Sequence, residues 1–287
     1  MTFDLHSTPC FGVAGNFTGH LEQAGEARDF ANVKTVEANA PKALFPTYIP
    51  IAQGMCIDEN AVPVFLHNFP FDSEKIIFPK GEQKIQIEPE CALVCEVLWK
   101  AGRVVSLEPK AFAATNDCSI RKEGAKKISV KKNWGPSSKG FSSNAIDIDS
   151  FAPGGILDRY RIASFLVRGS DVFAYGEDSA VRDYSYIYAK LTDWIVDRLN
   201  FQQDEGPAEN INAYLQHAGC PSKIMVSIGA TRYTDFGEHN FLQCGDKAVV
   251  VLYPEDKYTH EDIALCVKEN KLDAEDLSAL VQEVVVG

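Results

Sequence analysis

Two glutamates lie two residues apart in the apolar, β-branched stretch Ile85 to Val97, which reads IQIEPECALVCEV. Side chains alternate along a strand, so Glu88 and Glu90 would point to the same face, roughly 7 Å apart. If that face meets water, the pair needs no explanation. If it faces a pocket, the pair predicts a bound cation, because buried carboxylates need a compensating charge.

A third acid, Asp117, ends the next predicted strand in FAATNDCSIRK. An Asn-Asp pair at that place can also be ordinary turn chemistry. Three converging carboxylates would repel by about 4 kcal/mol per close pair at an effective dielectric near 20. Such a cluster either takes up a proton or binds a metal. Ligands that are all oxygen favour Mg²⁺ or Mn²⁺ over zinc.

Composition limits the remaining functions. The chain has 287 residues, 45% of them hydrophobic, and a net charge of −12, which argues against general nucleic-acid binding. No run of 18 apolar residues predicts a membrane helix, and the start, MTFDLHSTPC, does not resemble a secretory signal. Eight cysteines without a Cys-x-x-Cys pair favour reduced core cysteines, such as Cys91 and Cys95, in a cytoplasmic protein.

The elements that must position these acids are mostly strands. Strand patterns cover 10–15, 46–54, 62–69, 75–79, 84–99, 103–117, 222–237 and 246–254, and 159–177 predicts a hairpin that turns at RGSD. An apolar stripe from Ile187 to Leu199 predicts a helix over 184–199. No Gly-x-Gly-x-x-Gly motif follows a strand, so a dinucleotide-binding domain is not expected.

The chain changes character from Thr259. Leu277, Leu280, Val281, Val284 and Val285 repeat at helical spacing, with Asp273 as a candidate N-cap. We therefore expect residues 259–287 to form a short helical hairpin packed on a mainly β core.

Several segments together resemble the fumarylacetoacetate hydrolase family. IEPECALV, ATNDCSIRK and SSKGF are similar, in that order, to the family's Glu-x-Glu strand, Asn-Asp-x-Ser-Ala-Arg segment and Gly-Lys-Ser-Phe segment. Upstream, GVAGNFTGHLEQAG resembles the Gly-x-Asn-Tyr-x-x-His-x-x-Glu opening, and IIFP the strand before Glu-x-Glu. Downstream, MVSIGATRY and LQCGDKAVVVL resemble the Thr-Gly-Thr-Pro and Lys-x-Gly-Asp strands. The resemblance spans residues 11–252.

The resemblance implies that Glu88, Glu90 and Asp117 hold a divalent ion. Family members use this ion to chelate a 2-oxo acid or β-dicarbonyl and to stabilise an enolate during C–C cleavage, decarboxylation, hydration or tautomerisation. Lys139 matches the active-site lysine. Arg121 matches an arginine that can clamp a carboxylate, although Lys122 stands where an aspartate usually follows. The alternative for a single lysine is an ordinary surface position.

His20 matches the family's general base, in GNFTGH. A lone histidine is otherwise more often a packing or surface residue. The glutamate that partners this histidine in hydrolytic and decarboxylating members is replaced by Gln23. Glu22 lies one residue earlier, about 100° away on a helix, and is kept as a candidate catalytic residue.

Two further features concern the substrate. Ser227 and Thr231 straddle the Thr-Gly-Thr position, and we expect one hydroxyl near the substrate carboxylate. The segment 121–140 carries seven Lys or Arg against one acid, Glu123. This segment either focuses an anionic substrate toward the metal or is a solvated loop.

The prediction is an α+β, mainly β fold, a fumarylacetoacetate-hydrolase-like mixed β-sandwich or β-roll with a helical C-terminal appendage. Residues 1–258 would be the catalytic domain, with an N-terminal lid segment in 1–60, and 259–287 the appendage. The function would be Mg²⁺- or Mn²⁺-dependent hydrolysis, decarboxylation or hydration of a small anionic 2-oxo carboxylate or β-dicarbonyl by a cytoplasmic homodimer, with no nucleic-acid or membrane partner. The rivals are an impaired metal- or carboxylate-binding protein, which the change to Gln23 favours, a partner-binding tail, and nucleic-acid binding through 121–140.

Overall fold

The predicted strands around the acids form the central hairpin of the fold. The computed structural model describes residues 3–30, 33, 35–52, 54, 56–122 and 124–287. Strands β6 (Pro89–Lys100) and β7 (Arg103–Asn116) pair antiparallel along their length. Ala101 and Gly102 connect them with φ values of 50° and 77°, the positive values that a two-residue type I′ turn requires.

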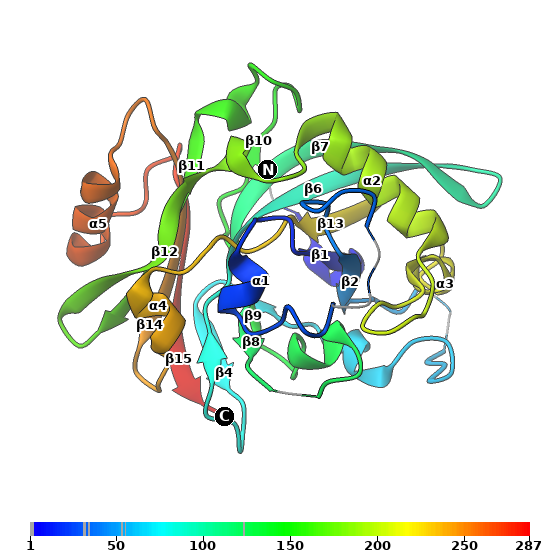
Figure 1. Ribbon diagram of the computed structural model, residues 1–287, viewed down its shortest axis with the longest axis horizontal. Helices are drawn as coiled ribbons and strands as arrows, with labels where there is room; N and C mark the ends of the chain where they lie inside the picture. The colour runs from blue at the N-terminus through cyan, green and yellow to red at the C-terminus, as the bar shows by residue number, and fades with distance from the viewer. Residues whose placement is uncertain (1–2, 31–32, 34, 53, 55, 123) are drawn as a thin grey trace.

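The larger sheet has eight strands (Figure 1). Its order is β2 (Ala43–Tyr48), β1 (Cys10–Ala14), β13 (Lys223–Ser227), β6, β7, β9 (Lys139–Phe141) and β3 (Phe71–Asp72), with β10 (Ile146–Asp147) paired to β7. The pairs β1–β13 and β3–β9 are parallel, and the other pairs of this sheet are antiparallel. The sheet is therefore mixed, as the resemblance implied.

A second sheet has five strands. Its order is β12 (Asp171–Ala180), β11 (Tyr160–Arg168), β14 (Lys247–Pro254), β15 (Ser278–Val286) and β4 (Lys75–Phe78). A short pair, β5 (Ile85–Gln86) and β8 (Ser119–Ile120), completes the strands. The predicted hairpin over 159–177 is confirmed as β11 and β12.

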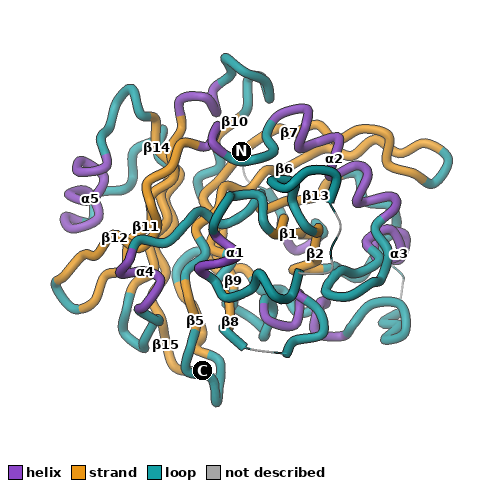
Figure 2. The backbone as a smooth tube through the Cα atoms, viewed as in Figure 1, coloured by secondary structure: helices purple, strands orange, loops and turns teal. Residues whose placement is uncertain are grey.

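Helices are short and lie around the sheets (Figure 2). The α-helices are α1 (His20–Gln23), α2 (Tyr188–Phe201), α3 (Ile211–His217), α4 (Asp235–His239) and α5 (His260–Glu269). The 3-10 helices are η1 (Leu5–Ser7), η2 (Val64–His67), η3 (Ile128–Lys131), η4 (Ile156–Arg159) and η5 (Val181–Asp183). The predicted central helix is confirmed as α2, and it buries Leu191, Ile195 and Leu199.

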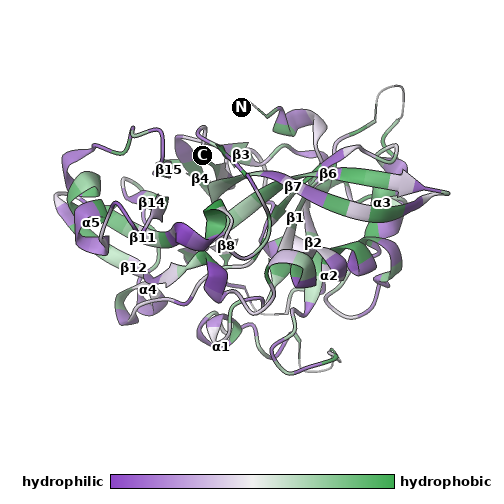
Figure 3. Ribbon diagram, turned by 90° about the horizontal axis from the view of Figure 1, so that it is seen from above, coloured by the Kyte–Doolittle hydropathy of each residue, from purple (hydrophilic) through white to green (hydrophobic). Residues whose placement is uncertain are grey.

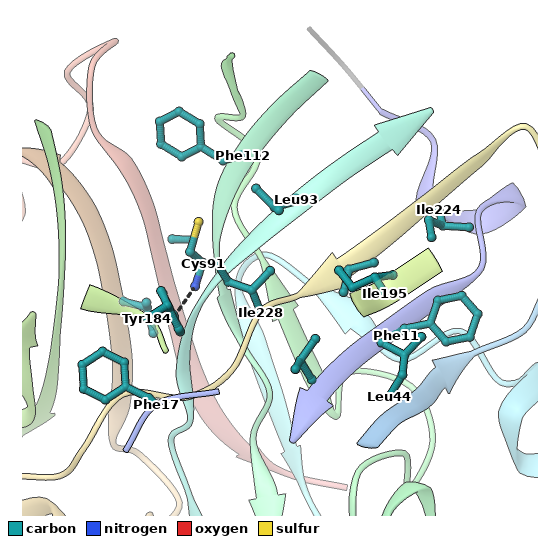
Figure 4. Packing of buried hydrophobic residues seen from close by; sticks show 14 of the residues in the cluster. Phe11, Phe17, Leu44, Cys91, Leu93, Phe112, Tyr184, Ile195, Ile224 and Ile228 are labelled. Atoms are coloured by element: carbon teal, nitrogen blue, oxygen red, sulfur yellow. Dashed lines mark hydrogen bonds between the residues drawn. The ribbon is translucent and has the colours of Figure 1, made fainter. Parts of the chain in front are cut away.

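One hydrophobic core joins the two sheets and α2. Buried side chains from β1, β2, β6, β7, β13 and α2 pack together in it, and Figure 4 shows Phe11, Leu44, Leu93, Phe112 and Ile224 among them. Apolar residues line the strands, and polar residues concentrate on loops and helix surfaces (Figure 3). The predicted mainly β fold is confirmed.

The prediction for the C-terminal segment is half right. Helix α5 is present, with a capping box between Thr259 and Asp262. The second predicted helix is wrong, because residues 278–286 form β15 between β14 and β4, and Asp273 caps no helix. Both faces of β15 are packed: Leu280 and Val284 face the main core, whereas Val281 faces the cluster under α5. Apolar residues on both faces of a strand imitate helical spacing.

The strand predicted over 62–69 is also wrong, because Val64–His67 forms η2. Pro63 and Pro70 bracket this apolar run, and Leu66 turns inward to pack in the core. Within the described ranges, none of the helices has the length and apolar character needed to span a bilayer. All eight cysteines are free thiols, and Cys10, Cys91, Cys95 and Cys118 are buried, as predicted for core cysteines.

Candidate functional site

The structure brings Glu88, Glu90 and Asp117 together. Glu88 directly precedes β6, Glu90 is its second residue and Asp117 follows β7, so antiparallel pairing places all three at one end of the hairpin. One carboxylate oxygen of each lies within 4.8 Å of the others. Their exposed fractions are 3%, 2% and 2%, so this face does not meet water. We call these three residues the carboxylate triad.

Backbone contacts fix the triad. The Asp117 N–H donates to the Glu88 carbonyl at 3.0 Å, and the Glu88 N–H donates to the Asn116 side-chain oxygen at 3.1 Å. The Asn116 amide in turn donates to Gln282 at 3.0 Å, and Gln282 donates to the Lys139 carbonyl at 3.1 Å. Strand β15, which carries Gln282, therefore supports the site from behind.

Three cations, of which Lys132 and Lys139 are buried, contact two of the three carboxylates. Arg121 contacts Glu88 at 2.8 Å, and Lys139 contacts the Asp117 Oδ1 atom at 2.8 Å. Lys132 lies 2.5 Å from the Glu88 Oε2 atom and 2.6 Å from the Asp117 Oδ2 atom. Glu90 instead accepts the Gly229 N–H at 2.8 Å.

This asymmetry separates the acidities of the two glutamates. Burial opposes ionisation of Glu88, but Lys132 and Arg121 outweigh burial and hold the pKa of Glu88 well below its usual range. Burial, together with the negative charges of Asp117 and Glu88, raises the pKa of Glu90 well above its usual range. Burial also lowers the pKa of Lys139.

Several triad oxygens accept no hydrogen bond in the described part of the chain. Both Asp117 carboxylate oxygens and the Glu88 Oε1 atom are buried, and their cation contacts lack hydrogen-bond alignment. Three carboxylates with open lone pairs and no nitrogen or sulfur donor are the ligand set that Mg²⁺ or Mn²⁺ takes. The donor set therefore fits a divalent cation, although the Lys132 ammonium already contacts two of its members.

His20 begins α1, which lies near the middle of the molecule in Figure 1 and in front of the two sheets, as the view from above shows (Figure 3). His20 is 4% exposed, and the Nδ1 atom of its ring lies 2.8 Å from the Thr231 carbonyl oxygen. Because a carbonyl can only accept, Nδ1 carries the proton, and the Nε2 atom of the neutral ring has a free lone pair. Burial lowers the pKa of His20, which favours this neutral, basic form.

The structure does not bring Glu22 to the site. Glu22 is exposed, whereas Gln23 donates to the Tyr233 carbonyl at 3.1 Å and accepts the Tyr233 N–H at 2.8 Å. Gln23 thus ties α1 to the segment after β13 instead of orienting the His20 ring. The buried acid nearby is Glu26, which follows the end of α1 and is 7% exposed.

Arg121 lies at the site but is occupied by protein groups. In addition to Glu88, it contacts Glu26 at 2.9 Å, Gln86 at 2.6 Å and the Tyr233 hydroxyl at 2.6 Å. In this arrangement its guanidinium has no pair of free N–H groups with which to bind a substrate carboxylate in bidentate fashion.

The two predicted hydroxyls differ in their positions. The Ser227 hydroxyl lies against the Met225 sulfur at 3.8 Å and makes no hydrogen bond to the triad. The backbone N–H of Thr231 donates to Pro89 at 3.3 Å, between the two glutamates, and its hydroxyl is buried with no hydrogen-bond partner among the described residues. Of this pair, only Thr231 is placed at the site.

A cleft of about 590 Å³ adjoins the site. Residues of the segment after α1 and of the basic segment line it, among them Glu26, Arg28, Arg121, Lys122 and Lys131. Arg121 faces this cleft and also contacts Glu88, so its ion pair with Glu26 closes the triad off from the cleft.

The family follows from comparison with known sequences. The model of a family of unknown function, DUF5718, matches residues 26–284. The chain belongs to the DUF5718 family. No curated protein matches this DUF5718 chain.

Solved structures share the fold of this DUF5718 protein. Cg1458 with inhibitor matches with a TM-score of 0.55 at 13% identity, over 98% of this chain and 77% of that one. 2-Keto-3-deoxy-D-arabinonate dehydratase complexed with magnesium and 2,5-dioxopentanoate matches with a TM-score of 0.53 at 13% identity, over 97% of this chain and 73% of that one. Yeast ynq8, a fumarylacetoacetate hydrolase family protein, matches with a TM-score of 0.54 at 12% identity, over 98% of this chain and 95% of that one. The fold is that of the fumarylacetoacetate hydrolase family, as the resemblance implied.

Lys132, Lys131 and Glu26 are site residues that motif matching missed. Lys131 pairs with Glu26 and with Asp29, each at 2.9 Å. With Lys132 and Lys139, it makes three buried lysines in the basic segment, so that segment is not a purely solvated loop. Its single acid, Glu123, lies outside the described residues. The concentration of Lys in a strongly acidic chain was the available signal for the two lysines.

Proposed function

We propose that this DUF5718 protein is a divalent-metal-dependent enzyme that acts on a small 2-oxo carboxylate or β-dicarbonyl. The observation that carries this proposal is the buried carboxylate triad, whose ligand oxygens lie within 4.8 Å of one another. Glu88, Glu90 and Asp117 would hold Mg²⁺ or Mn²⁺. The bound ion would supply Lewis acidity, polarising a carbonyl and orienting the substrate.

Charge balance favours an anionic substrate. Three cations, Arg121, Lys132 and Lys139, contact Glu88 and Asp117, so the charges of these two carboxylates are already offset before a metal binds. A divalent ion adds two positive charges in a buried place, and a carboxylate ligand offsets part of them. The 2,5-dioxopentanoate in the similar dehydratase structure is a ligand of this chemical class.

The protein groups have separate roles in this proposal. The unprotonated His20 Nε2 atom would remove or return a proton, because Nδ1 is engaged by the Thr231 carbonyl. Lys139, anchored between Asp117 and the Cys118 carbonyl, would place a positive charge beside a developing oxyanion. The basic cleft would admit the substrate, and Arg121 would exchange Glu26 for the substrate carboxylate.

The reaction would be C–C hydrolysis, decarboxylation or hydration. These reactions share proton transfer next to a carbonyl, so the direct test is exchange of the C3 protons of oxaloacetate and pyruvate in D₂O with Mg²⁺ or Mn²⁺. We expect the wild type to accelerate exchange and His20→Gln to lose at least 100-fold of it, since Gln can bond Thr231 but cannot take the proton. His239→Ala, at an exposed histidine that also lies against a backbone carbonyl, is the control. Exchange that does not depend on His20 contradicts its role.

A catalytically impaired metal- or carboxylate-binding protein is the second candidate. It is favoured by the positions of Glu22, which is exposed, and of Gln23, which bonds Tyr233. This candidate predicts metal binding without accelerated exchange, whereas the enzyme predicts both. Absence of metal binding contradicts the enzyme and leaves only the carboxylate-binding form of the second candidate.

Assembly and compartment complete the proposal. We propose a cytoplasmic homodimer, with eight free thiols fitting a reducing compartment. Sedimentation equilibrium of the purified protein tests the dimer, and a single species at the monomer mass of 31.6 kDa would refute it.

A further inference from the structure

Lys132 occupies an unusual place in the candidate metal site. It caps the C-terminal end of η3, is 2% exposed, and its ammonium contacts one oxygen from each of two triad members. No other lysine contacts two triad carboxylates in the part of the chain that the structure describes. The position carries no role in the motif resemblance.

The other two buried lysines of the basic segment, Lys139 and Lys131, make different contacts from those of Lys132. Lys139 contacts a single triad oxygen and is also anchored on the Cys118 carbonyl at 2.5 Å. Lys131 forms ion pairs with Glu26 and Asp29, which are not members of the triad. Lys132 makes one aligned hydrogen bond, to Glu88, and is held near Asp117 by charge without hydrogen-bond alignment.

The Lys132 ammonium lies at two of the three carboxylates that would hold a divalent ion. Mg²⁺ binds carboxylate oxygens at about 2.0–2.1 Å, and Lys132 lies 2.5 and 2.6 Å from one oxygen each of Glu88 and Asp117. Two cations at the same pair of carboxylates in a buried site repel strongly. The Lys132 side chain also lies 5.2 Å from the centroid of the Phe45 ring, a face that can receive the ammonium by a cation–π contact.

We propose that Lys132 is an internal counter-cation, which occupies the cation position of the triad in the metal-free protein and competes with the divalent ion. This inference rests on the proposed metal site and adds to it what sets the site's affinity. The triad is then charge-compensated without metal, the protein folds without metal, and metal binding requires Lys132 to move off Glu88 and Asp117.

The test is equilibrium Mn²⁺ binding, followed by electron paramagnetic resonance, in wild type, Lys132→Met and Lys126→Met. Loss of the competing charge predicts a Kd at least ten-fold lower for Lys132→Met. Lys126→Met, at an exposed lysine of the same basic segment, should keep the wild-type Kd within two-fold. Without metal, Lys132→Met should melt at a lower temperature than wild type, and Mn²⁺ should restore its Tm.

Two further variants keep the test decisive. Lys132→Arg retains the charge and should show no ten-fold tightening, so tightening there would overturn the inference. Lys132→Gln, which can still donate one hydrogen bond to Glu88, replaces the Met variant if that variant does not fold, with the same expected tightening.

The outcomes separate this inference from the proposed function. If wild type binds Mn²⁺ and the neutral variants bind it equally or more weakly, Lys132 is not a competitor but the metal site stands. If only the neutral variants bind Mn²⁺, the inference holds and metal dependence of the natural protein is refuted. If none binds, both are refuted.

Discussion

Glu209 is a buried carboxyl whose ionisation should weaken the fold as pH rises from about 5 to just above neutral. It is 1% exposed, accepts the Ser129 hydroxyl at 3.0 Å, and its second oxygen has no hydrogen-bond partner among the described residues. Burial raises the pKa of Glu209 from its ordinary 4.5 to about 7. Between these values the folded protein binds more protons than the unfolded chain, so the free energy of unfolding falls as pH rises and then levels off above the folded pKa.

The size of the effect follows from these two pKa values. One pKa unit corresponds to about 1.36 kcal/mol, so the Glu209 contribution to unfolding free energy falls by about 2.5 kcal/mol from pH 5 to pH 8. Glu209→Gln removes the titration. Urea unfolding at both pH values should show wild type losing about 2.5 kcal/mol more than the variant over this interval.

A control variant shows whether the pH dependence of the unfolding free energy comes from the buried Glu209 carboxyl or from removing any carboxylate charge. Glu205→Gln changes an exposed carboxylate four residues earlier and should lose the same stability as wild type over the interval. If the unfolding free energies of Glu209→Gln and wild type changed equally between pH 5 and pH 8, the raised pKa of Glu209 would be refuted. Because Ser129 belongs to η3, the same residue also links this carboxyl to the segment that carries Lys132.

Three further predictions concern residues that hold the site in place. Tyr184→Phe removes the hydroxyl that donates to the Gly229 carbonyl at 2.6 Å (ring in Figure 4), and should lower the urea-unfolding free energy by about 1–3 kcal/mol; an unchanged value would contradict this role. Gln23→Glu places a carboxylate against the Tyr233 carbonyl, so hydrogen exchange of α1 should accelerate, while exchange in α5 should not. Truncation after residue 258 removes β15 from between β14 and β4 and should abolish cooperative thermal unfolding, and a cooperative melt would show that the sheet does not need it.

Sequence reasoning worked where the relevant contacts are local. Glu88 and Glu90 begin and Asp117 follows one hairpin that is continuous in sequence, so strand alternation and pairing bring them together at its open end. The contacts of Lys132 with Glu88 and of Arg121 with Glu26 cross 44 and 95 residues, and no local pattern encodes them.

The mistaken elements have an equally physical cause. Strand β15 is apolar on both faces because it lies between the main core and the cluster under α5, and this erases the two-residue period that identifies a half-exposed strand. Glu22 matched a motif by proximity alone. The structure uses the neighbouring Gln23 to hold α1 and supplies a buried acid from Glu26, beyond the end of that helix.

The most direct test of the central claim is Mn²⁺ binding to wild type and Asp117→Asn. The account predicts one Mn²⁺ per chain in the wild type and loss of at least 100-fold in affinity in Asp117→Asn, which keeps the shape of the side chain but removes a negative oxygen ligand. Asp29→Asn, which neutralises a carboxylate outside the triad, should bind like wild type. Equal affinity of wild type and Asp117→Asn would show that the three carboxylates do not form a metal site.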